Sequence, residues 1–276
     1  MTDRRTIGRD TVLCMSLSAR PGTFGSRFHN HLYEALGLDW IYKAFTTIDL
    51  ASVVAGIRAL GIRGCAVSMP FKEACIPMLD ALDASAKAID SVNTIVNDGG
   101  KLTGHNTDYG AIAPLLAKHG VAPGTDFALH GSGGMAKAVT AALRDAGFTR
   151  GTVVARNRET GGALAARYGY GWQETLGASR PRMLVNVTPI GMQGGPEARA
   201  LAFPDEVIAK ADVVFDVVAV PVETPLVRAG RAAGKTVITG GEVIVLQAVE
   251  QFALYTGIRP TAEQVSAAAD YALAVP

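Results

Sequence analysis

Short apolar runs alternate with amphipathic stretches along most of the chain. The run TVLCMSLS at 11–18 predicts a strand, as do IYKAFTT at 41–47 and IRGCAVSMP at 62–70. Between the last two, DLASVVAGIRALG at 49–61 places its apolar residues on one stripe and ends in glycine, which is typical of an amphipathic helix. Strands that alternate with helices in this way predict an α/β fold with a mainly parallel sheet.

The pattern changes at SVNTIVNDGGKLTGHNTD and then restarts. Its Asn97–Gly100 segment predicts the turn of a β-hairpin. Beyond residue 108 a helix is expected at 109–118, followed by further strands and helices. The restart predicts an N-terminal α/β domain at 1–108 and a doubly wound second domain at 109–240. The final helices, at about 241–276, could pack on either.

Composition narrows the class of protein. The chain is 49% hydrophobic and 18% charged, which is enough to bury a core and excludes wholesale disorder. A net charge of +1 and 7% aromatic residues offer neither a basic field nor a stacking surface, so no nucleic-acid partner is expected. No apolar stretch reaches the roughly 18–20 residues of a membrane helix, and the polar N-terminus has no apolar signal region. We therefore expect a soluble protein with no membrane partner.

The cysteines and histidines bear on cellular location and on metal binding. The three cysteines show no CxxC spacing, which favours a reducing compartment and a cytoplasmic location. The five histidines show no metal-ligand spacing with cysteine or acidic residues, so no metal site is expected.

A glycine-rich turn between a predicted strand and helix is the clearest local motif. It consists of Gly131, Ser132, Gly133, Gly134, Met135 and Ala136. The first glycine permits a tight turn, the second lets a pyrophosphate approach the backbone, and the final small residue allows helix–strand packing. A glycine-rich turn with no ligand is the alternative. The flanking strand and helix favour a dinucleotide site.

The end of the next strand bears on which dinucleotide binds. An NAD site usually places an acidic residue there to bind the ribose 2′-hydroxyl. This chain instead has Arg156, Asn157 and Arg158, which suit a 2′-phosphate and favour NADP over NAD. Glu159 opposes this assignment, and a solvated charged turn is the alternative.

Polar residues at other strand ends are candidate site residues. Ser16, Ser18, Ser68 and Lys72 lie at or just beyond the carboxyl ends of predicted strands, where open α/β sheets bind ligands. Taken singly, each has an ordinary explanation. A lone lysine there is usually a surface residue, Asp108 would serve as a helix N-cap, and Asn93 would be a turn or strand residue.

Ordered motifs over almost the whole chain resemble those of the shikimate dehydrogenase family. The matched positions, in chain order, are Ser16 and Ser18, His29-Asn30, Ala66–Lys72, Asn93-Thr94, Asn106-Thr107-Asp108, Gly131–Gly134, Asn157-Arg158-Glu159, Asn186–Met192 and Gln247. Several independent motifs in the family's order make this resemblance specific.

The resemblance implies a substrate domain and a Rossmann-type NADP domain, with the active site in the cleft between them. It assigns 241–276 to the first domain and makes Lys72 and Asp108 the catalytic pair. It implies a substrate site of Ser16, Ser18, Ser68, Asn93 and Gln247. It extends the cofactor site to Thr188 and Gly191. The implied reaction is 3-dehydroshikimate + NADPH = shikimate + NADP, and the implied protein is a monomer or a homodimer.

Departures from the family pattern bear on the substrate. The segment 19–28 is longer than usual, so we expect a remodelled loop in which Arg20 or Arg27 adds an anion contact. This chain has Ala219 where the family has a pocket tyrosine, and Val243 where the family has a methionine before the late glutamine. This pattern resembles the divergent shikimate dehydrogenase-like branch, with shikimate, quinate or a related cyclic acid as substrate. The alternative is a low-turnover NADP- or metabolite-binding sensor or partner-binding protein on the same fold.

Overall fold

The structure is a computed structural model that describes residues 7–274. The chain separates into two compact units. Unit 1 holds the described residues up to Thr107 and from Ala248 onward, and unit 2 holds Asp108–Gln247. The long helix α10 (Gly240–Thr256) passes from unit 2 into unit 1 along the chain.

Unit 1 is built on a six-stranded sheet with the order β2-β1-β3-β5-β6-β4. Its strands are β1 (Val12–Leu17), β2 (Trp40–Phe45), β3 (Gly64–Val67), β4 (Ala81–Leu82), β5 (Thr94–Asp98) and β6 (Lys101–His105). β1 runs parallel to β2 and β3, and β4 runs parallel to β6. β5 is antiparallel to both its neighbours. The predicted hairpin is confirmed, and Gly99 and Gly100 adopt the positive φ that its turn requires.

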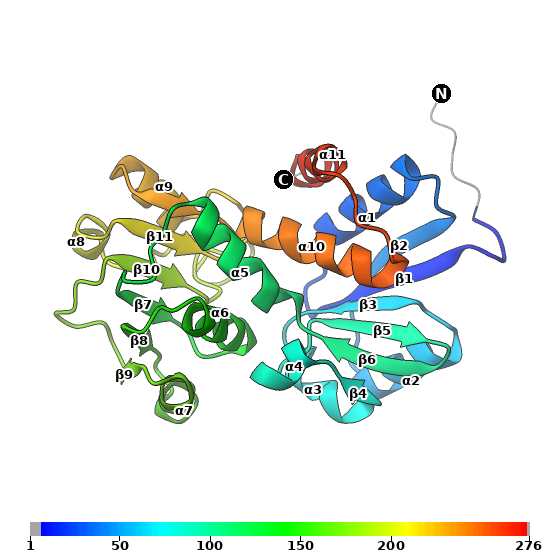
Figure 1. The fold of residues 1–276 in the computed structure, drawn as a ribbon, viewed down its shortest axis with the longest axis horizontal. Helices are drawn as coiled ribbons and strands as arrows, with labels where there is room; N and C mark the ends of the chain where they lie inside the picture. Colours follow the sequence, from blue (N-terminus) through cyan, green and yellow to red (C-terminus); the bar gives the residue numbers. More distant parts are fainter. Residues whose placement is uncertain (1–6, 275–276) are drawn as a thin grey trace. The chain divides into compact units, whose positions relative to one another are not determined.

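Helices cover both faces of this sheet (Figure 1). They are α1 (Phe24–Ala35), α2 (Leu50–Ala59), α3 (Phe71–Ala74), α4 (Ala84–Ile89), the second half of α10, and α11 (Ala262–Leu273), with a 3-10 turn at Ile76–Met78. α2 begins where the Asp49 carboxylate accepts from the Ser52 amide, and it buries Val54 and Ile57 against the sheet. On the other face α10 approaches closely, because a Cβ at Gly64 would lie 2.2 Å from the Tyr255 ring.

Unit 2 has a fully parallel sheet with the order β12-β11-β10-β7-β8-β9. Its strands are β7 (Phe127–His130), β8 (Gly151–Val154), β9 (Gly171–Gln173), β10 (Met183–Asn186), β11 (Val213–Asp216) and β12 (Thr236–Ile238). When the six strands of unit 2 are numbered by their order in the sequence, their order across the sheet from β9 is 3-2-1-4-5-6. This is the doubly wound Rossmann order, with its switch point between β7 and β10.

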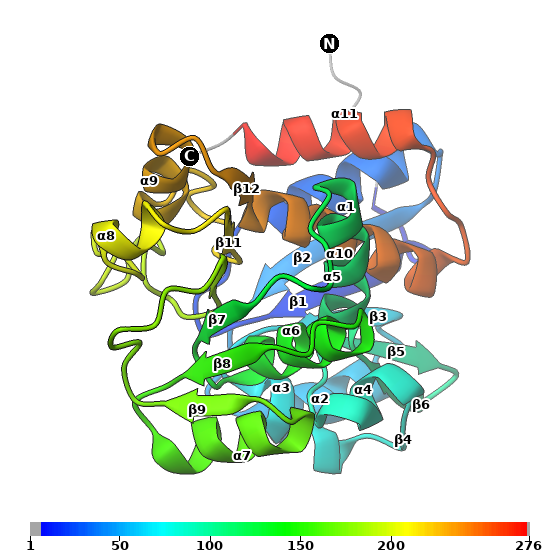
Figure 2. The same cartoon turned by 60° about the vertical axis from the view of Figure 1, so that its left-hand side comes forward.

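Two layers of helices enclose the sheet of unit 2 (Figure 2). The elements are α5 (Thr107–Lys118), α6 (Gly134–Asp145), α7 (Arg158–Tyr168), α8 (Asp205–Ile208) and α9 (Pro225–Ala232). Apolar residues of α5, α6 and α7 share one buried cluster, and those of α8 and α9 share another. The two clusters lie on opposite faces of the strands, as the alternation of side chains along a strand requires.

The segment 19–28 differs from the expected loop. Helix α1 already begins at Phe24, so only the residues before it form the connection. Arg27 lies on this helix, donates to the carbonyl of Tyr271 on α11 at 2.6 Å and stacks over its ring. Arg27 thus joins α1 to α11, and the anion contact expected from Arg20 or Arg27 stays a prediction. Among residues 7–274, no helix is long and apolar enough to span a membrane.

Candidate functional site

The three candidate serines share one edge of the sheet in unit 1. Leu17 and Val67 are register partners at the ends of β1 and β3, and the Ser68 amide donates to the Leu17 carbonyl at 2.9 Å. Ser16 and Ser18 are half-buried, whereas Ser68 is exposed. The carboxyl ends of two adjacent parallel strands thus bring these hydroxyl-bearing residues together, as the strand pattern predicted.

Asn93 is the central polar residue of this edge. Its side-chain oxygen accepts from the Thr107 amide and the Thr94 hydroxyl, both at 2.8 Å, and its side-chain nitrogen donates to the Thr107 hydroxyl at 3.0 Å. Its backbone carbonyl accepts from the Val67 amide at 2.7 Å. Asn93 is buried and joins the end of β3 to the start of α5.

Lys72 and Thr107, the residue before Asp108, are hydrogen-bonded to Val92 and Asn93, respectively. Lys72 lies on the short helix α3 and is half-buried; its carbonyl accepts from the Val92 amide at 2.9 Å. Asp108 directly follows Thr107, the partner of Asn93, and is 1% exposed. Thr107, the residue before Asp108, therefore hydrogen-bonds to Asn93, which follows the Val92 partner of Lys72.

A second glutamine on α10 was not among the predicted site residues. Gln251 is buried and donates to the Thr94 hydroxyl at 3.1 Å and to the Asn93 carbonyl at 3.4 Å. The predicted Gln247 is half-buried and lies one helical turn earlier, at the end of unit 2. Their spacing of four puts both on one face of the helix, and this spacing was the available sequence signal.

His29 and Asn30, which matched a family motif, serve packing within unit 1. His29 is fully buried and stacks on Tyr42, with 4.4 Å between the ring centroids. Burial lowers the pKa of His29 to about 3, so the ring is neutral at physiological pH. The Asn30 side chain both donates to the Tyr42 carbonyl and accepts from its amide, at 2.9 Å each.

In unit 2 the glycine-rich turn follows β7 and leads into α6. Gly131 has a φ of +129°, and a Cβ there would lie 2.9 Å from Val187 and 3.3 Å from Thr188. Gly133 is the N-cap of α6, no side chain caps the helix there, and a Cβ would meet no atom within 4 Å. The backbone around Gly133 is therefore open to an anionic group. Ser132, Gly134 and Met135 are half-buried, and Ala136 packs in the core.

The charged loop after β8 lies beside this turn. Arg156, Asn157 and Arg158 are exposed, and the Asn157 side chain caps α7 by accepting from the Thr160 amide at 3.1 Å. The hydroxyls of Ser132 and Thr160 are 2.8 Å apart and join the glycine-rich turn to α7. The two guanidinium groups thus emerge near an open glycine cradle, and this donor set fits a 2′-phosphate.

Thr188 and Gly191 belong to the loop after β10. The Asn186 side-chain oxygen accepts from the Thr188 hydroxyl at 2.6 Å and from its amide at 3.1 Å. Gly191 has a φ of +89°, and a Cβ there would lie 3.3 Å from Thr224. Because Gly131 also approaches Thr188, the loops after β7, β10 and β11 meet at one edge of the sheet.

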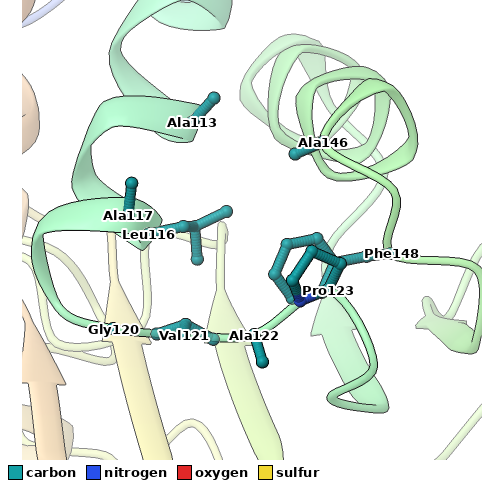
Figure 3. A pocket seen from close by; sticks show the side chains of 9 residues that line it. All are labelled: Ala113, Leu116, Ala117, Gly120, Val121, Ala122, Pro123, Ala146 and Phe148. Carbon is teal, nitrogen blue, oxygen red and sulfur yellow. The ribbon is translucent and has the colours of Figure 1, made fainter.

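Two cavities of unit 2 lie apart from these residues. One, of about 340 Å³, is apolar and lies between the end of α5 and the segment after α6 (Figure 3). It is lined by Ala113, Leu116, Ala117, Gly120, Val121, Ala122, Pro123, Ala146 and Phe148. It contains none of the predicted site residues. Within 7–274, no group of three or more histidine, cysteine or acidic side chains is gathered to hold a metal ion.

Comparisons with known proteins agree with this architecture. Residues 23–95 match the model of the shikimate dehydrogenase substrate binding domain. A shikimate dehydrogenase-like protein of Haemophilus influenzae is 57% identical over 96% of this chain and 98% of its own. The structure of shikimate 5-dehydrogenase from Thermus thermophilus, in complex with NADP(H) and shikimate, is 30% identical with a TM-score of 0.84, covering 95% of this chain and all of the other.

A third relative differs in its ligands. The structure of quinate dehydrogenase from Corynebacterium glutamicum, in complex with NAD, is 27% identical with a TM-score of 0.84 and covers 96% of this chain and 99% of its own. The fold, the ordered motifs and these likenesses over nearly the full length agree. The chain therefore belongs to the shikimate dehydrogenase family of oxidoreductases.

Proposed function

We propose that the protein is an NADP-dependent oxidoreductase. It catalyses reversible hydride transfer at the 3-position hydroxyl or keto group of shikimate or a related cyclic polyhydroxy acid. The observation that carries this proposal is the cluster around Asn93. In it, Asn93 and its neighbour Val92 bind the residue before Ser68, the backbone of Lys72 and the residue before Asp108.

The cofactor residues support NADP. NADP, when bound, supplies the hydride acceptor for alcohol oxidation and, reduced, the donor for ketone reduction. The open backbone at Gly133 suits the pyrophosphate, and Arg156 and Arg158 suit the 2′-phosphate. Thr188 and Gly191 form the neighbouring loop. Glu159, in the first turn of α7, offsets part of the positive charge.

Lys72 and Asp108 carry the proton chemistry. Ketone reduction needs a proton at the developing alkoxide, and alcohol oxidation needs that proton removed. Lys72 donates or accepts this proton at Nζ, and Asp108 orients the ammonium group. The ammonium group of a lysine carries three N–H donors, which suits it to supply the proton in the direction of reduction.

The substrate residues suit a hydroxylated carboxylic acid. Ser16, Ser18, Ser68, Asn93 and Gln247 offer hydroxyl and amide groups to the carboxylate and hydroxyls. Ala219, half-buried in the loop after β11, lacks the hydroxyl and ring of the family's tyrosine. One lost hydrogen bond weakens binding by about 0.5–1.5 kcal/mol, and lost ring packing adds to this. We therefore expect slow or weak turnover of shikimate.

The test is a dehydrogenase assay over a panel of cyclic hydroxy acids, with NADP and with NAD. The proposal expects NADP-dependent oxidation of at least one acid and a kcat/KM on shikimate below the ~10⁴–10⁸ M⁻¹s⁻¹ of ordinary enzymes. Ala219→Tyr should raise the shikimate value, with Ala219→Ser as the control that restores a hydroxyl without a ring. Tight NADP binding with no turnover of any acid would instead support a sensor.

We assign the enzyme to the cytoplasm. Its three cysteines are free and buried, and burial raises the pKa of the Cys75 thiol to about 11. Such inert thiols suit a reducing compartment.

A further inference from the structure

We propose that Asp216 is a positioning residue of the cofactor site. Its carboxylate joins the loops after β10 and β11, and the charge on that carboxylate controls how tightly the site binds NADP. The inference rests on the proposed function in that NADP is taken as the ligand.

Asp216 ends β11 and is fully buried. One carboxylate oxygen accepts from the Asn186 side-chain nitrogen at 3.0 Å and from the Val218 amide at 3.1 Å. The other accepts from the Thr224 hydroxyl at 2.6 Å. A single buried group therefore binds three different segments: the end of β10, the loop after β11 and the start of α9.

The contacts continue from Asp216 to the glycine-rich turn. Asn186, held by Asp216, accepts two hydrogen bonds from Thr188 and also donates to the Ile190 carbonyl at 3.1 Å. Thr188 in turn lies against Gly131, where a Cβ would come within 3.3 Å of it. The side chains of Asn186 and Thr188 thus connect the Asp216 carboxylate to the glycine-rich turn that suits the pyrophosphate.

A second set of contacts runs through Thr224. Its hydroxyl accepts from the Val227 amide at 3.1 Å and so caps α9. Thr224 also packs against Gly191, which needs its positive φ at this close approach. The loop that carries Thr188 and Gly191 is therefore fixed at both ends by partners of Asp216.

The partners of Asp216 are all neutral. Burial raises the pKa of its carboxyl to about 6, against the weaker opposing effect of the three hydrogen bonds. On the same sheet face, His130 is the register partner of Asn186 on β7, and its ring binds the Ala202 carbonyl. Burial lowers the pKa of His130 and so favours its neutral form.

Charged groups on the other packed elements have partners of their own. Arg228 and Arg231 on α9 both bind Glu223, the first at its carbonyl and the second at its carboxylate. The neighbouring strand β12 (Thr236–Ile238) carries no titratable side chain. After β12, Glu242 binds Lys118 and His119.

Protonation changes the bonds that Asp216 can make. The Asn186 and Val218 nitrogens only donate, so the proton must go to the oxygen that faces Thr224, whose hydroxyl can accept. Hydrogen bonds to an ionised carboxylate are about twice as strong as neutral ones. Ionised Asp216 therefore holds the two loops more firmly, and NADP affinity should rise as pH increases through the pKa of Asp216.

Asp216→Asn has the shape of the protonated form but does not ionise. NADP dissociation constants are measured by calorimetry from pH 5 to 8 for the wild type and this variant. The ratio of the two constants cancels the titration of the NADP 2′-phosphate itself. We expect near-equal constants at pH 5 and about five- to tenfold weaker binding by the variant at pH 8. A ratio that does not change with pH overturns the inference.

Thr224→Val and Thr224→Ser keep the test decisive if Asp216→Asn fails to fold. Removal of the hydroxyl that donates to the carboxylate should move the midpoint of the NADP pH profile upward, and the serine variant should keep the wild-type midpoint. Equal midpoints overturn the inference. If the wild type binds no NADP at any pH, the proposed function fails, and the inference fails with it.

Discussion

Both units bury a hydrogen-bonded polar cluster at the ends of their strands, but the two clusters differ in charge. In unit 1, Asn93 is joined to Thr107 and Gln251, and the three side chains are neutral. In unit 2, Asn186 and Thr224 are joined through the carboxylate of Asp216. A neutral cluster makes the same bonds at any physiological pH. A buried carboxylate with a pKa of about 6 does not.

The difference in charge between the two clusters matches the two functions assigned to the units, proton transfer in unit 1 and cofactor binding in unit 2. The neutral cluster holds the residues assigned to proton chemistry, whose geometry then stays constant while the substrate exchanges a proton. The charged cluster holds the loops assigned to the cofactor, so its protonation should act on cofactor binding. Each prediction below asks whether a change in one unit alters only the property assigned to that unit.

The largest expected effect is on turnover. Lys72→Ala should lower kcat by about 10²–10⁴-fold, the usual range for a lost acid–base group. NADP affinity should stay near the wild-type value, because the change lies in unit 1 and the residues assigned to the cofactor lie in unit 2. Steady-state kinetics and calorimetry measure the two properties. Lys87→Ala, at an exposed lysine on α4, is the matched control. Near-normal turnover would remove Lys72 from the mechanism.

The next effect is on stability and depends on pH. The pKa of Asp216 is raised in the folded state from 3.8 to about 6, because the cost of burying the charge exceeds the gain from its hydrogen bonds. The contribution of Asp216 to the unfolding free energy is therefore fully present below pH 3.8 and is lost as pH rises through about 6, even though the ionised carboxylate makes the stronger bonds to the two loops. The shift corresponds to about 3 kcal/mol. Relative to Asp216→Asn, the wild type should therefore lose about that much unfolding free energy between pH 4 and 7. Urea unfolding measures it, and a constant difference between the two proteins would contradict the account.

Glu242 also makes the unfolding free energy depend on pH, and the comparison of the wild type with Asp216→Asn removes its contribution. Hydrogen bonds from Lys118 and His119 lower its pKa to about 2, so its contribution has the opposite sign and is lost as pH falls. The wild type and Asp216→Asn share it, and it cancels in their difference.

A third effect is confined to cofactor binding. Arg158→Ala should weaken NADP binding by about one to two orders of magnitude, because a charge-assisted contact contributes about 1.5–3 kcal/mol. NAD binding should hardly change, since NAD lacks the 2′-phosphate. Titration with both dinucleotides measures this, and Arg167→Ala, near the end of α7, controls for lost charge. Equal weakening of both cofactors would show that Arg158 does not read the phosphate.

The smallest effect concerns the neutral cluster. Gln251→Leu removes the donor to Asn93 and Thr94, and should lower unfolding free energy by about 1–2 kcal/mol. This loss should be the same at pH 5 and pH 8, because no member of the cluster titrates there. Urea unfolding at the two pH values tests it. A loss that grows with pH would mean that the clusters do not differ as described.

Local sequence signals predicted much of the fold. The glycine-rich turn between an apolar run and a long helix predicted the Rossmann unit, and Asn97–Gly100 predicted the hairpin. Short elements such as β4 and β9 were missed, because two or three residues carry no periodicity.

The site could be predicted only where residues follow strands directly. Ser16, Ser18 and Ser68 lie at one sheet edge because parallel strands end together. Gln251 and Asp216 depend on partners distant in the chain, and neither Arg27 nor Gln251 shows its packing partner in the local sequence. Burial decides what such residues do, and burial comes from the tertiary fold.

The most direct test of the account follows the hydride itself. The protein is incubated with NADP and with cyclic hydroxy acids, shikimate included, that carry deuterium at the oxidised carbon, and the reduced cofactor is analysed by mass spectrometry. The account predicts reduced NADP that carries the deuterium, formed by the wild type and by Asp216→Asn at pH 8 and formed about 10²–10⁴-fold more slowly by Lys72→Ala. Reduced NADP without deuterium, or none with any acid while NADP binds, would contradict it.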